Sequence, residues 1–347
     1  MYLKKILLAI VLLGLVGMAG FSYYVYTNVF SANTGFNNDQ AHVFISTGAT
    51  FNMVQEELSP LLKDMKTFNT VAKKKGYSAN IKAGHFIIKK GSNNNEIINS
   101  IRTGNVPVKI KFNNQERLVN LAGHLATQME ADSLSFIKAM LNLDFLKASG
   151  FNQDTALGMY IPNTYEVYWN TTAEAFCDKM LKQYNTFWNA SRVSKAKKLQ
   201  MSRDQVMALA AIVQKETAMV EERAIVAGLY INRLKKGMLL QADPTVIFAK
   251  KKSENNFTQV IKRVLYKDLE NISPYNTYKH AGVPPGPIAM PDVSAIDGVL
   301  NYQKHAFYYM VANVQDFGYH KFAKTLAGHN RNRRAYVNWI NTQGVNR

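Results

Sequence analysis

Glu216 is a carboxylic acid at an apolar position of a helix that the sequence predicts over residues 203–217. Leu209, Ile212 and Val213 fall on one helical face by their i, i+3, i+4 spacing. The next position of that face, i+7, holds the glutamate. If this face is packed, burial disfavours the charged carboxylate and raises its pKa. A carboxyl group of that kind can donate a proton near neutral pH, as a general acid does.

A second interpretation of Glu216 stays open from the residues alone. In the last turn of a helix its side chain could turn into solvent and pair with Lys215 or Arg223. Two further acids, Glu221 and Glu222, follow within a few residues. They suit the first turn of the next predicted helix, where negative charge meets the positive end of the helix dipole. We therefore expect a structural role for these two acids.

Two loops after these helices supply polar groups that a ligand could contact. Asp243 is expected to cap the N-terminus of a helix, with Pro244 at its first position, where a missing N–H costs nothing. Gln241 has no such structural explanation and is freer to contact a ligand. The segment 273–291 is a long loop whose prolines restrict φ, and stiff loops of this length are usually functional.

Amide and aromatic side chains, which are the types that bind sugars, occur in this loop and earlier in the chain. Apolar ring faces stack on pyranose faces, while amides and phenols form hydrogen bonds with the hydroxyl groups. Core packing is the competing explanation, and it must hold for at least half of the aromatic residues. The candidates are Asn276, Tyr278, Tyr160, Tyr165, Tyr168 and Trp169.

The composition favours an anionic partner. The 347 residues include 42 Lys and Arg against 24 Asp and Glu, a formal charge of +18, which suits nucleic acid, acidic lipid or an anionic polymer. Cys177 is the single cysteine, so we expect no disulfide and a buried, unreactive thiol. Nucleotide-binding and zinc-protease motifs are missing, and the seven histidines lack metal-ligand spacing. The sequence therefore predicts neither a cofactor nor a metal.

The N-terminus carries a membrane-spanning pattern. Lys4 and Lys5 precede an apolar stretch over residues 6–26, long enough to cross a bilayer as a helix. A cleaved signal peptide is the alternative, but its apolar core is usually shorter, about 7–15 residues, and no clear cleavage site follows. The lysines favour a cytoplasmic N-terminus, with residues 30–347 outside the cytoplasm. An exported domain does not meet the chromosome, so nucleic acid is not expected as a partner.

The remaining patterns predict an α+β protein of several parts. We assign residues 1–30 to a cytoplasmic tip and transmembrane helix, 31–40 to a linker, 41–112 to a small α+β module and 113–347 to a larger mixed α+β catalytic domain. The small module twice shows a strand, a glycine turn and a helix. It resembles LysM-type glycan-binding modules, although a small adaptor without a ligand fits the pattern equally well. In the larger part, helices are predicted at 173–190, 203–217 and 220–236, a strand pair within 305–313 and 318–323, and a final helix at 330–340.

Four sequence blocks occur together along the chain. They are "IPNTYEVYW" (161–169), "AAIVQKETAMVEERAIVAGLYINRLKKGMLLQADPTVIFA" (210–249), "SPYNTYKHAGVPPGPIAMP" (273–291) and "YHKFAKTLAGHN" (319–330). These blocks, with the N-terminal anchor and the LysM-like module, resemble the MltG/YceG-like family of endolytic murein transglycosylases over nearly the whole chain. Some positions depart from the family pattern. Leu157 and Asn163 stand where many members have acids, Gln214 replaces a common glutamate, and Asp292 stands where a glycine often follows the loop proline.

The resemblance implies a bacterial inner-membrane protein whose catalytic domain faces the periplasm. Such a protein cuts nascent glycan strands between N-acetylmuramic acid and N-acetylglucosamine. The glutamate of K-E-T, here Glu216, would protonate the glycosidic oxygen. It would then take a proton from the C6 hydroxyl of the muramic residue, which closes a 1,6-anhydro ring. A hydrolase would need a second positioned carboxylate; Asp243 and Glu166 are the candidates near the motifs.

We therefore expect a lytic transglycosylase without cofactor or metal. Its expected partners are peptidoglycan glycan strands, the inner membrane through residues 6–26, and peptidoglycan synthases. Two alternatives stay open, a muramidase that hydrolyses the same bond and a non-catalytic peptidoglycan-binding scaffold. The predicted site consists of Glu216 as the catalytic residue and Gln241, Asp243, Asn276, Tyr278, Tyr165, His329 and Asn330 as substrate-binding residues.

Overall fold

The computed structural model describes residues 2–342 of a chain that divides into two compact units. Helices and short strands occur in both units, so the protein is α+β, as predicted. The first unit comprises Met1–Ile110, Gln128–Ala131 and Tyr165–Thr172, and the second comprises Lys111–Thr127, Asp132–Thr164 and Ala173–Arg347.

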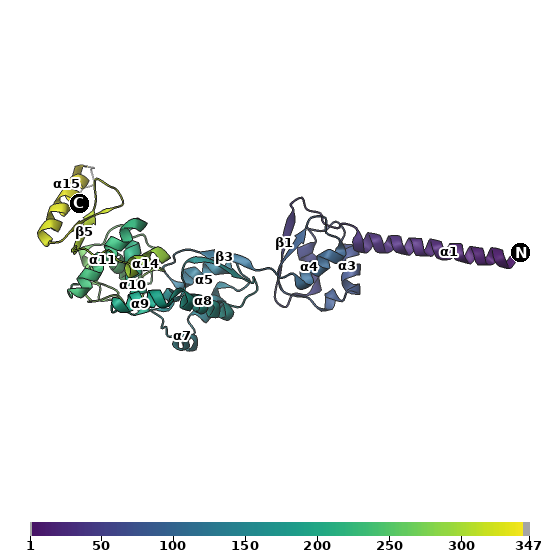
Figure 1. Ribbon diagram of the computed structural model, residues 1–347, viewed down its shortest axis with the longest axis horizontal. Helices are drawn as coiled ribbons and strands as arrows, with labels where there is room; N and C mark the ends of the chain where they lie inside the picture. Colours follow the sequence, from purple (N-terminus) through teal and green to yellow (C-terminus); the bar gives the residue numbers. More distant parts are fainter. Residues whose placement is uncertain (1, 343–347) are drawn as a thin grey trace. The chain divides into compact units, whose positions relative to one another are not determined.

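A long apolar helix begins the first unit (Figure 1). α1 (Tyr2–Val25) continues into a π-helical turn, η1 (Tyr26–Phe30), and neither contains a buried residue. Within residues 2–342, Tyr2–Phe30 is the one helix long and apolar enough to cross a membrane. This finding is compatible with a single-pass membrane anchor.

The predicted strand–turn–helix pattern occurs twice in the first unit. β1 (Gln40–Ile45) and β2 (Gly84–Lys89) pair antiparallel. After each strand a glycine with positive φ turns the chain, Gly48 at 75° and Gly91 at 81°, a conformation that glycine adopts without strain. The other elements that lie wholly or partly in this unit are α2 (Phe51–Leu58), α3 (Met65–Lys74), η2 (Tyr77–Ala79), α4 (Asn94–Thr103) and β3 (Val108–Phe112).

Capping side chains determine where the helices of this unit begin. The Thr50 hydroxyl accepts a hydrogen bond from the backbone N–H of Met53 and caps the N-terminus of α2. Asn93 and Glu96 form a reciprocal capping box at the start of α4. Behind these caps the helices and the strand pair enclose an apolar core that includes Val43, Ile45, Val54, Leu58, Phe68, Phe86, Ile88, Ile97, Ile98 and Ile101.

Residues 31–39 of the predicted linker are hydrogen-bonded into the first unit. Asn33 is only 5% exposed, and its side chain bonds to the backbone of Asp64 and to the amide of Asn94. The hydroxyl of Thr34 accepts a hydrogen bond from the backbone N–H of Gly91. The polar composition of residues 31–40 predicted a linker exposed to solvent. The structure instead shows that residues distant in the sequence form hydrogen bonds with Asn33 and Thr34 inside the unit.

The first unit also includes two segments that the sequence placed in the larger domain. Glu130 accepts a hydrogen bond from the hydroxyl of Thr47 at 2.8 Å, and the Trp169 ring lies 5.2 Å from the ring of Phe44. These contacts join residues more than 80 positions apart, so no local pattern could reveal them. The predicted boundary at residue 112 therefore differs from the observed division.

α10 (Arg203–Glu216) is a fully packed helix of the second unit. Every residue from Val206 to Val213 is buried, and α11 (Arg223–Lys235) and α14 (Val293–Leu300) pack against it (Figure 1). A capping box of Ser202 and Gln205 begins the helix. It ends at Glu216, one residue before the predicted end, because Thr217 takes extended backbone angles.

The other predicted elements of this unit are confirmed with adjusted limits. The helix predicted at 173–190 is α8 (Ala173–Phe187), and the one predicted at 220–236 is η4 (Val220–Glu222) followed by α11. β5 (Tyr309–Ala312) pairs antiparallel with β6 (His320–Ala323), and α15 (Leu326–Thr342) follows. The remaining elements are α5 (Leu118–Ala126), α6 (Ser133–Met140), α7 (Leu143–Ser149), η3 (Ala156–Met159), β4 (Asn163–Val167, paired with β3), α9 (Ala190–Lys198), α12 (Asp243–Ser253) and α13 (Tyr266–Leu269).

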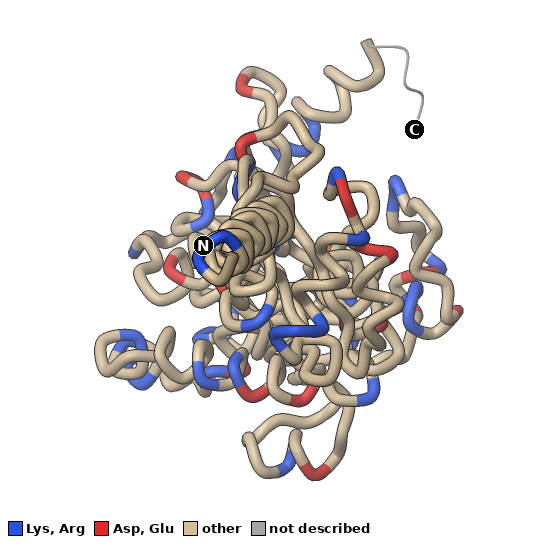
Figure 2. The backbone as a smooth tube through the Cα atoms, turned by 90° about the vertical axis from the view of Figure 1, so that its right-hand side faces the viewer, with Lys and Arg blue, Asp and Glu red and all other residues tan. Residues whose placement is uncertain are grey.

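Two further features agree with the sequence. Cys177 is buried beside the Tyr160 hydroxyl, so its predicted burial is confirmed. Burial raises the pKa of its thiol to about 11, which disfavours the reactive thiolate. Lys and Arg, which are in excess, occur in most parts of the chain, and Asp and Glu occur between them (Figure 2).

Candidate active site

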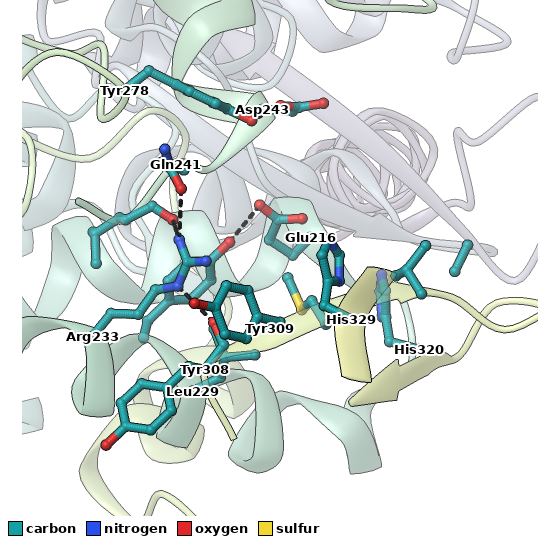
Figure 3. Close-up of a pocket in the computed structure, with 15 residues that line it drawn as sticks. Glu216, Leu229, Arg233, Gln241, Asp243, Tyr278, Tyr308, Tyr309, His320 and His329 are labelled. Carbon is teal, nitrogen blue, oxygen red and sulfur yellow. Dashed lines mark hydrogen bonds between the residues drawn. The ribbon is translucent and has the colours of Figure 1, made fainter. Parts of the chain in front are cut away.

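Glu216 ends α10 and lines a cavity of about 300 Å³ in the second unit (Figure 3). The structure brings five of the predicted site residues to this cavity: Glu216, Gln241, Asp243, Tyr278 and His329. The other lining residues come mainly from α11 and the β5–β6 hairpin, and they are Leu229, Tyr230, Arg233, Leu240, Tyr308, Tyr309, Met310, Val311, Ala312 and His320.

Tyr230 on α11 fixes the orientation of the Glu216 carboxyl group. Its hydroxyl lies 2.7 Å from Glu216 Oε1 and donates a hydrogen bond to it. Only 2% of Tyr230 is exposed, so the packed ring restricts the position of the carboxyl group that it contacts. Burial raises the pKa of Tyr230 well above its ordinary value, so the phenol remains a hydrogen-bond donor at neutral pH.

The pKa of the Glu216 carboxyl is raised to about 7. Burial is the largest cause, because it disfavours the charged form. The Tyr230 hydrogen bond lowers the pKa, the negative charge of Asp243 raises it, and the charges of His320 and Arg233 lower it. The raised pKa agrees with the argument from the apolar helix face. A carboxyl group in this range can both give and take a proton near neutral pH.

A buried carboxylate holds His320 at the cavity wall. Glu222 is 3% exposed and accepts hydrogen bonds from the backbone N–H of His320 at 2.6 Å and from its ring Nδ1 at 2.8 Å. This arrangement fixes which ring nitrogen is protonated and leaves Nε2 as the polar atom for the cavity side. The neighbouring Glu221 accepts a hydrogen bond from the hydroxyl of Tyr319. Both acids are structural, as predicted, but they bind the β5–β6 hairpin as well as preceding a helix.

Arg233 connects two walls of the cavity. It is 7% exposed and donates hydrogen bonds to the carbonyl oxygens of Leu239, Leu240 and Tyr308, at 3.1, 2.8 and 2.7 Å. A weaker contact of 3.4 Å reaches Oε1 of Gln241. The guanidinium therefore holds the segment before α12 and the segment entering β5 against α11.

The structure corrects the predicted role of Asp243. The residue is already inside α12, the N-cap position is held by Ala242, and Oδ1 of Asp243 accepts a 2.6 Å hydrogen bond from the Tyr278 hydroxyl. The Asp-Pro pair therefore begins the helix without the aspartate serving as its cap. The preceding Gln241 is exposed and has a φ of 51°, an uncommon left-handed conformation for a residue other than glycine. Such strained positions cluster at functional sites.

Three predicted site residues do not line this cavity. Asn276 is fully buried, and its side chain bonds to the backbone of Leu269, Asn271 and Tyr278, so it shapes the proline-rich loop from within. Tyr165 is 8% exposed and belongs to the first unit, and Asn330 is exposed on α15.

His329, by contrast, faces the cavity. Its ring stacks on Tyr309, and burial together with the charges of Arg233 and Arg333 lowers its pKa, which favours the neutral imidazole. Glu166, the other candidate second carboxylate, is exposed in the first unit. Among residues 2–342, no three His, Cys, Asp or Glu side chains are grouped closely enough to hold a metal ion.

The positions that depart from the family pattern lie outside the cavity lining. Leu157 is 6% exposed in η3, and Asn163 is exposed at the start of β4. Asp292 accepts a 2.6 Å hydrogen bond from Asn114 and forms an ion pair with Arg223. Its backbone N–H donates to the side chain of Gln214. None of these four residues is among those that line the cavity of Glu216.

Several known proteins are similar to this chain over most of its length. An endolytic murein transglycosylase of Bacillus subtilis is 30% identical over 315 residues, covering 85% of this chain and 84% of the relative. One of Streptococcus pneumoniae is 26% identical and covers 81% of this chain and 55% of the relative. A crystal structure of a putative YceG-like protein from Listeria monocytogenes matches with a TM-score of 0.57 at 27% identity, covering 85% of this chain and 99% of that one. The model of the YceG-like family matches residues 43–335, and the chain belongs to that family.

Proposed function

We propose that this protein is an endolytic lytic transglycosylase that cleaves the β-1,4 bond between N-acetylmuramic acid and N-acetylglucosamine in peptidoglycan strands. The observation that carries the proposal is Glu216, a carboxyl group with a pKa of about 7 at the wall of a cavity. The relatives named endolytic murein transglycosylases support the same activity.

The proposed reaction uses Glu216 twice. The protonated carboxyl gives its proton to the glycosidic oxygen, the bond from that oxygen to C1 of the muramic residue breaks, and positive charge develops at C1. The carboxylate then takes the proton of the C6 hydroxyl on the same residue, and the C6 oxygen bonds to C1. The products are a 1,6-anhydro end and a free 4-hydroxyl on the leaving sugar, and Glu216 is protonated again. The Tyr230 hydroxyl stabilises the carboxylate that exists between the two steps.

Removing the Tyr230 hydroxyl should move the alkaline limit of activity to higher pH. In Tyr230→Phe the carboxylate of Glu216 loses a hydrogen-bond donor, so the pKa of Glu216 rises above about 7. Because the first step needs protonated Glu216, kcat/KM should then decline at a higher pH than in the wild type. The measurement is a pH–rate profile of both proteins, and an alkaline limit that stays or moves to lower pH contradicts the assignment.

Asp243 is the residue through which a hydrolytic mechanism could operate. It lines the same cavity and its charge raises the pKa of Glu216. In the proposed mechanism, Asp243→Asn lowers the pKa of Glu216, moves the alkaline limit to lower pH and leaves cleavage at pH 5 within about tenfold of the wild type. If the protein were a hydrolase that needs this carboxylate as base or nucleophile, the cleavage rate of Asp243→Asn would instead fall by about 10²–10⁴-fold at every pH. Rates of Asp243→Asn across pH 5–8 separate the two mechanisms.

The N-terminal helix supplies the proposed cellular location. With Lys4 and Lys5 in the cytoplasm, residues 6–26 would cross the bacterial inner membrane once and leave the second unit outside the cytoplasm. The strand–turn–helix module of residues 41–112 would bind glycan chains in the manner of a LysM module. Peptidoglycan strands and peptidoglycan synthases are the proposed partners.

The length distribution of the products tests this function. Full-length protein in detergent micelles is incubated with purified peptidoglycan glycan strands, and the strand lengths are followed by chromatography. Internal cleavage shortens long strands early and yields fragments of many lengths. Accumulation of disaccharides from the ends would contradict endolytic action. Unchanged strands would support the non-catalytic scaffold.

A further inference from the structure

A second cavity adjoins the candidate active site. It has a volume of about 360 Å³ and is lined by Asp243, Arg263, Val264, Leu265, Tyr266, Leu269, Tyr278 and Arg333, all in the second unit. Asp243 and Tyr278 line both cavities, and the 2.6 Å hydrogen bond between them lies where the two meet. A ligand in the first cavity therefore passes this pair to enter the second.

α15 contributes one lining side chain to each of the two cavities. His329 lines the cavity of Glu216, and Arg333, four residues later, lines the second one. Residues four apart lie on the same face of a helix, one turn along. The charge of Arg333 reaches His329 strongly enough to lower the pKa of the imidazole. The two cavities thus form one continuous surface along the face of α15.

The second cavity carries positive charge that the protein does not neutralise. Arg263 and Arg333 are both exposed, and within residues 2–342 neither guanidinium forms an ion pair with a carboxylate. Other arginines of the unit are paired, such as Arg192 with Asp297 at 3.1 Å. Asp243 is the single acid among the lining residues, and its Oδ1 is occupied by the Tyr278 hydroxyl. The exposed ring of Tyr266, 84% accessible, adds an apolar contact surface.

The substrate of the proposed reaction carries a matching group. The muramic residue that reacts at C1 bears a peptide stem on its C3 oxygen, two ring carbons from the reacting atom. Such a stem is a short peptide with a free carboxylate at its end. An extended peptide spans about 3.3–3.6 Å per residue, so a stem of a few residues reaches beyond the sugar into a neighbouring cavity. Guanidinium groups bind carboxylates well because two N–H donors match two oxygen acceptors.

We propose that Arg263 and Arg333 form a subsite for the carboxylates of the peptide stem on the muramic residue that is cleaved. The inference rests on the proposed function for the identity of the substrate. This subsite makes the protein selective for glycan strands that still carry their peptide stems, and strands without stems bind more weakly.

Binding in a catalytically disabled background tests the subsite without requiring cleavage. Full-length Glu216→Gln in detergent micelles is titrated with stem-bearing glycan strands and with strands whose stems an amidase has removed. Neither preparation contains a lipid carrier, so lipid phosphate cannot account for a difference. We expect stem-bearing strands to bind about tenfold more tightly, and expect R263Q/R333Q to remove that preference while leaving the affinity for denuded strands unchanged.

A matched double variant controls for the loss of charge. Lys262 and Arg334 are exposed neighbours of the two arginines that do not line the cavity, so K262Q/R334Q should keep the preference. The proposal is overturned if both double variants weaken the binding of stem-bearing strands equally. It is also overturned if R263Q/R333Q weakens the binding of denuded strands as much as that of stem-bearing strands, or if R263Q/R333Q changes neither affinity. Failure of the proposed function would appear separately, as intact strands after incubation with the wild type.

Discussion

The Glu216→Gln variant is expected to cut glycan strands at least about 1,000-fold more slowly than the wild type, because glutamine can neither give nor take the proton that both steps require. Glutamine preserves the shape of the side chain and can still accept the hydrogen bond from Tyr230. The loss should therefore appear in kcat, with strand binding retained. Glu221→Gln removes an exposed acid that accepts a hydrogen bond from Tyr319 and does not line the cavity, and it should keep most of the activity.

The same variant should be more stable than the wild type above neutral pH. Glu216 has a pKa of about 7 in the folded protein against an ordinary value of 4.5, so the folded state binds more protons between these values. Stability consequently falls as pH rises from 4.5 to 7, and the full cost persists at pH 8. Glutamine does not titrate, so Glu216→Gln should gain about 1–3 kcal/mol in unfolding free energy at pH 8 and much less at pH 4.5. Urea unfolding followed by tryptophan fluorescence at both pH values measures the difference.

Each possible result for this variant bears on a different part of the account. An inactive, folded and stabilised Glu216→Gln supports Glu216 as a half-buried proton donor whose charged form is disfavoured in the folded state. Residual activity within tenfold of the wild type would contradict the assignment of Glu216. A destabilised variant at pH 8 would show that the carboxylate is favourably paired in the folded state, contrary to its raised pKa.

Replacing Arg233 should cause the largest loss of stability among the cavity residues. Arg233→Met keeps an unbranched side chain, but the carbonyl oxygens of Leu239, Leu240 and Tyr308 lose their donor. The hydrogen bond to Leu240 is buried and the other two are partly buried. A buried polar group left without a partner costs about 1–3 kcal/mol, so the variant should lose about 2 kcal/mol or more. Activity should fall as well, because the same three groups set the positions of two cavity walls.

A neighbouring cation provides the control for this prediction. Lys236 is exposed and follows the end of the same helix, so Lys236→Met should change the unfolding free energy by less than about 1 kcal/mol. Comparison of the urea midpoints of the two variants isolates the buried hydrogen bonds from the loss of a charge. Equal effects of both substitutions would contradict the structural role of Arg233.

Local patterns in the sequence predicted most of the elements that carry the site. The spacing of Leu209, Ile212 and Val213 predicted α10 and placed Glu216 on its packed face, and the raised pKa agrees with that argument. The strand pair before the last helix was also predicted, because alternating apolar residues and a short turn are local features. Helix limits shifted by a few residues, as expected where capping groups decide the ends.

The partners of Glu216 could not be predicted, because they depend on contacts between distant segments. Glu222 binds His320, 98 residues later, and Arg233 binds the carbonyl of Tyr308, 75 residues later. Tyr230 is nearer in the chain, fourteen residues beyond Glu216 on the next helix. No periodicity identifies it as the hydrogen-bond donor.

The predicted helix cap Asp243 and the predicted sugar-binding residue Asn276 both form other hydrogen bonds than expected, for identifiable physical reasons. Asp243 precedes a proline at a helix start, where capping is common, but its carboxylate bonds to the Tyr278 hydroxyl from the neighbouring loop. Asn276 has the chemistry of a sugar-binding residue, yet its amide satisfies backbone groups inside the loop. Residue type indicates which hydrogen bonds a side chain can form, whereas the fold decides with which partner it forms them.

The ends of the cleaved strands test the central claim most directly. Full-length protein digests stem-bearing strands in water enriched in ¹⁸O, and mass spectrometry examines the muramic ends. If Glu216 alone acts as acid and then as base toward the C6 hydroxyl, every new end is a 1,6-anhydro ring without ¹⁸O, and Glu216→Gln produces none. Reducing ends that contain one ¹⁸O atom would instead show that water attacks C1, and they would contradict the proposed transglycosylase mechanism.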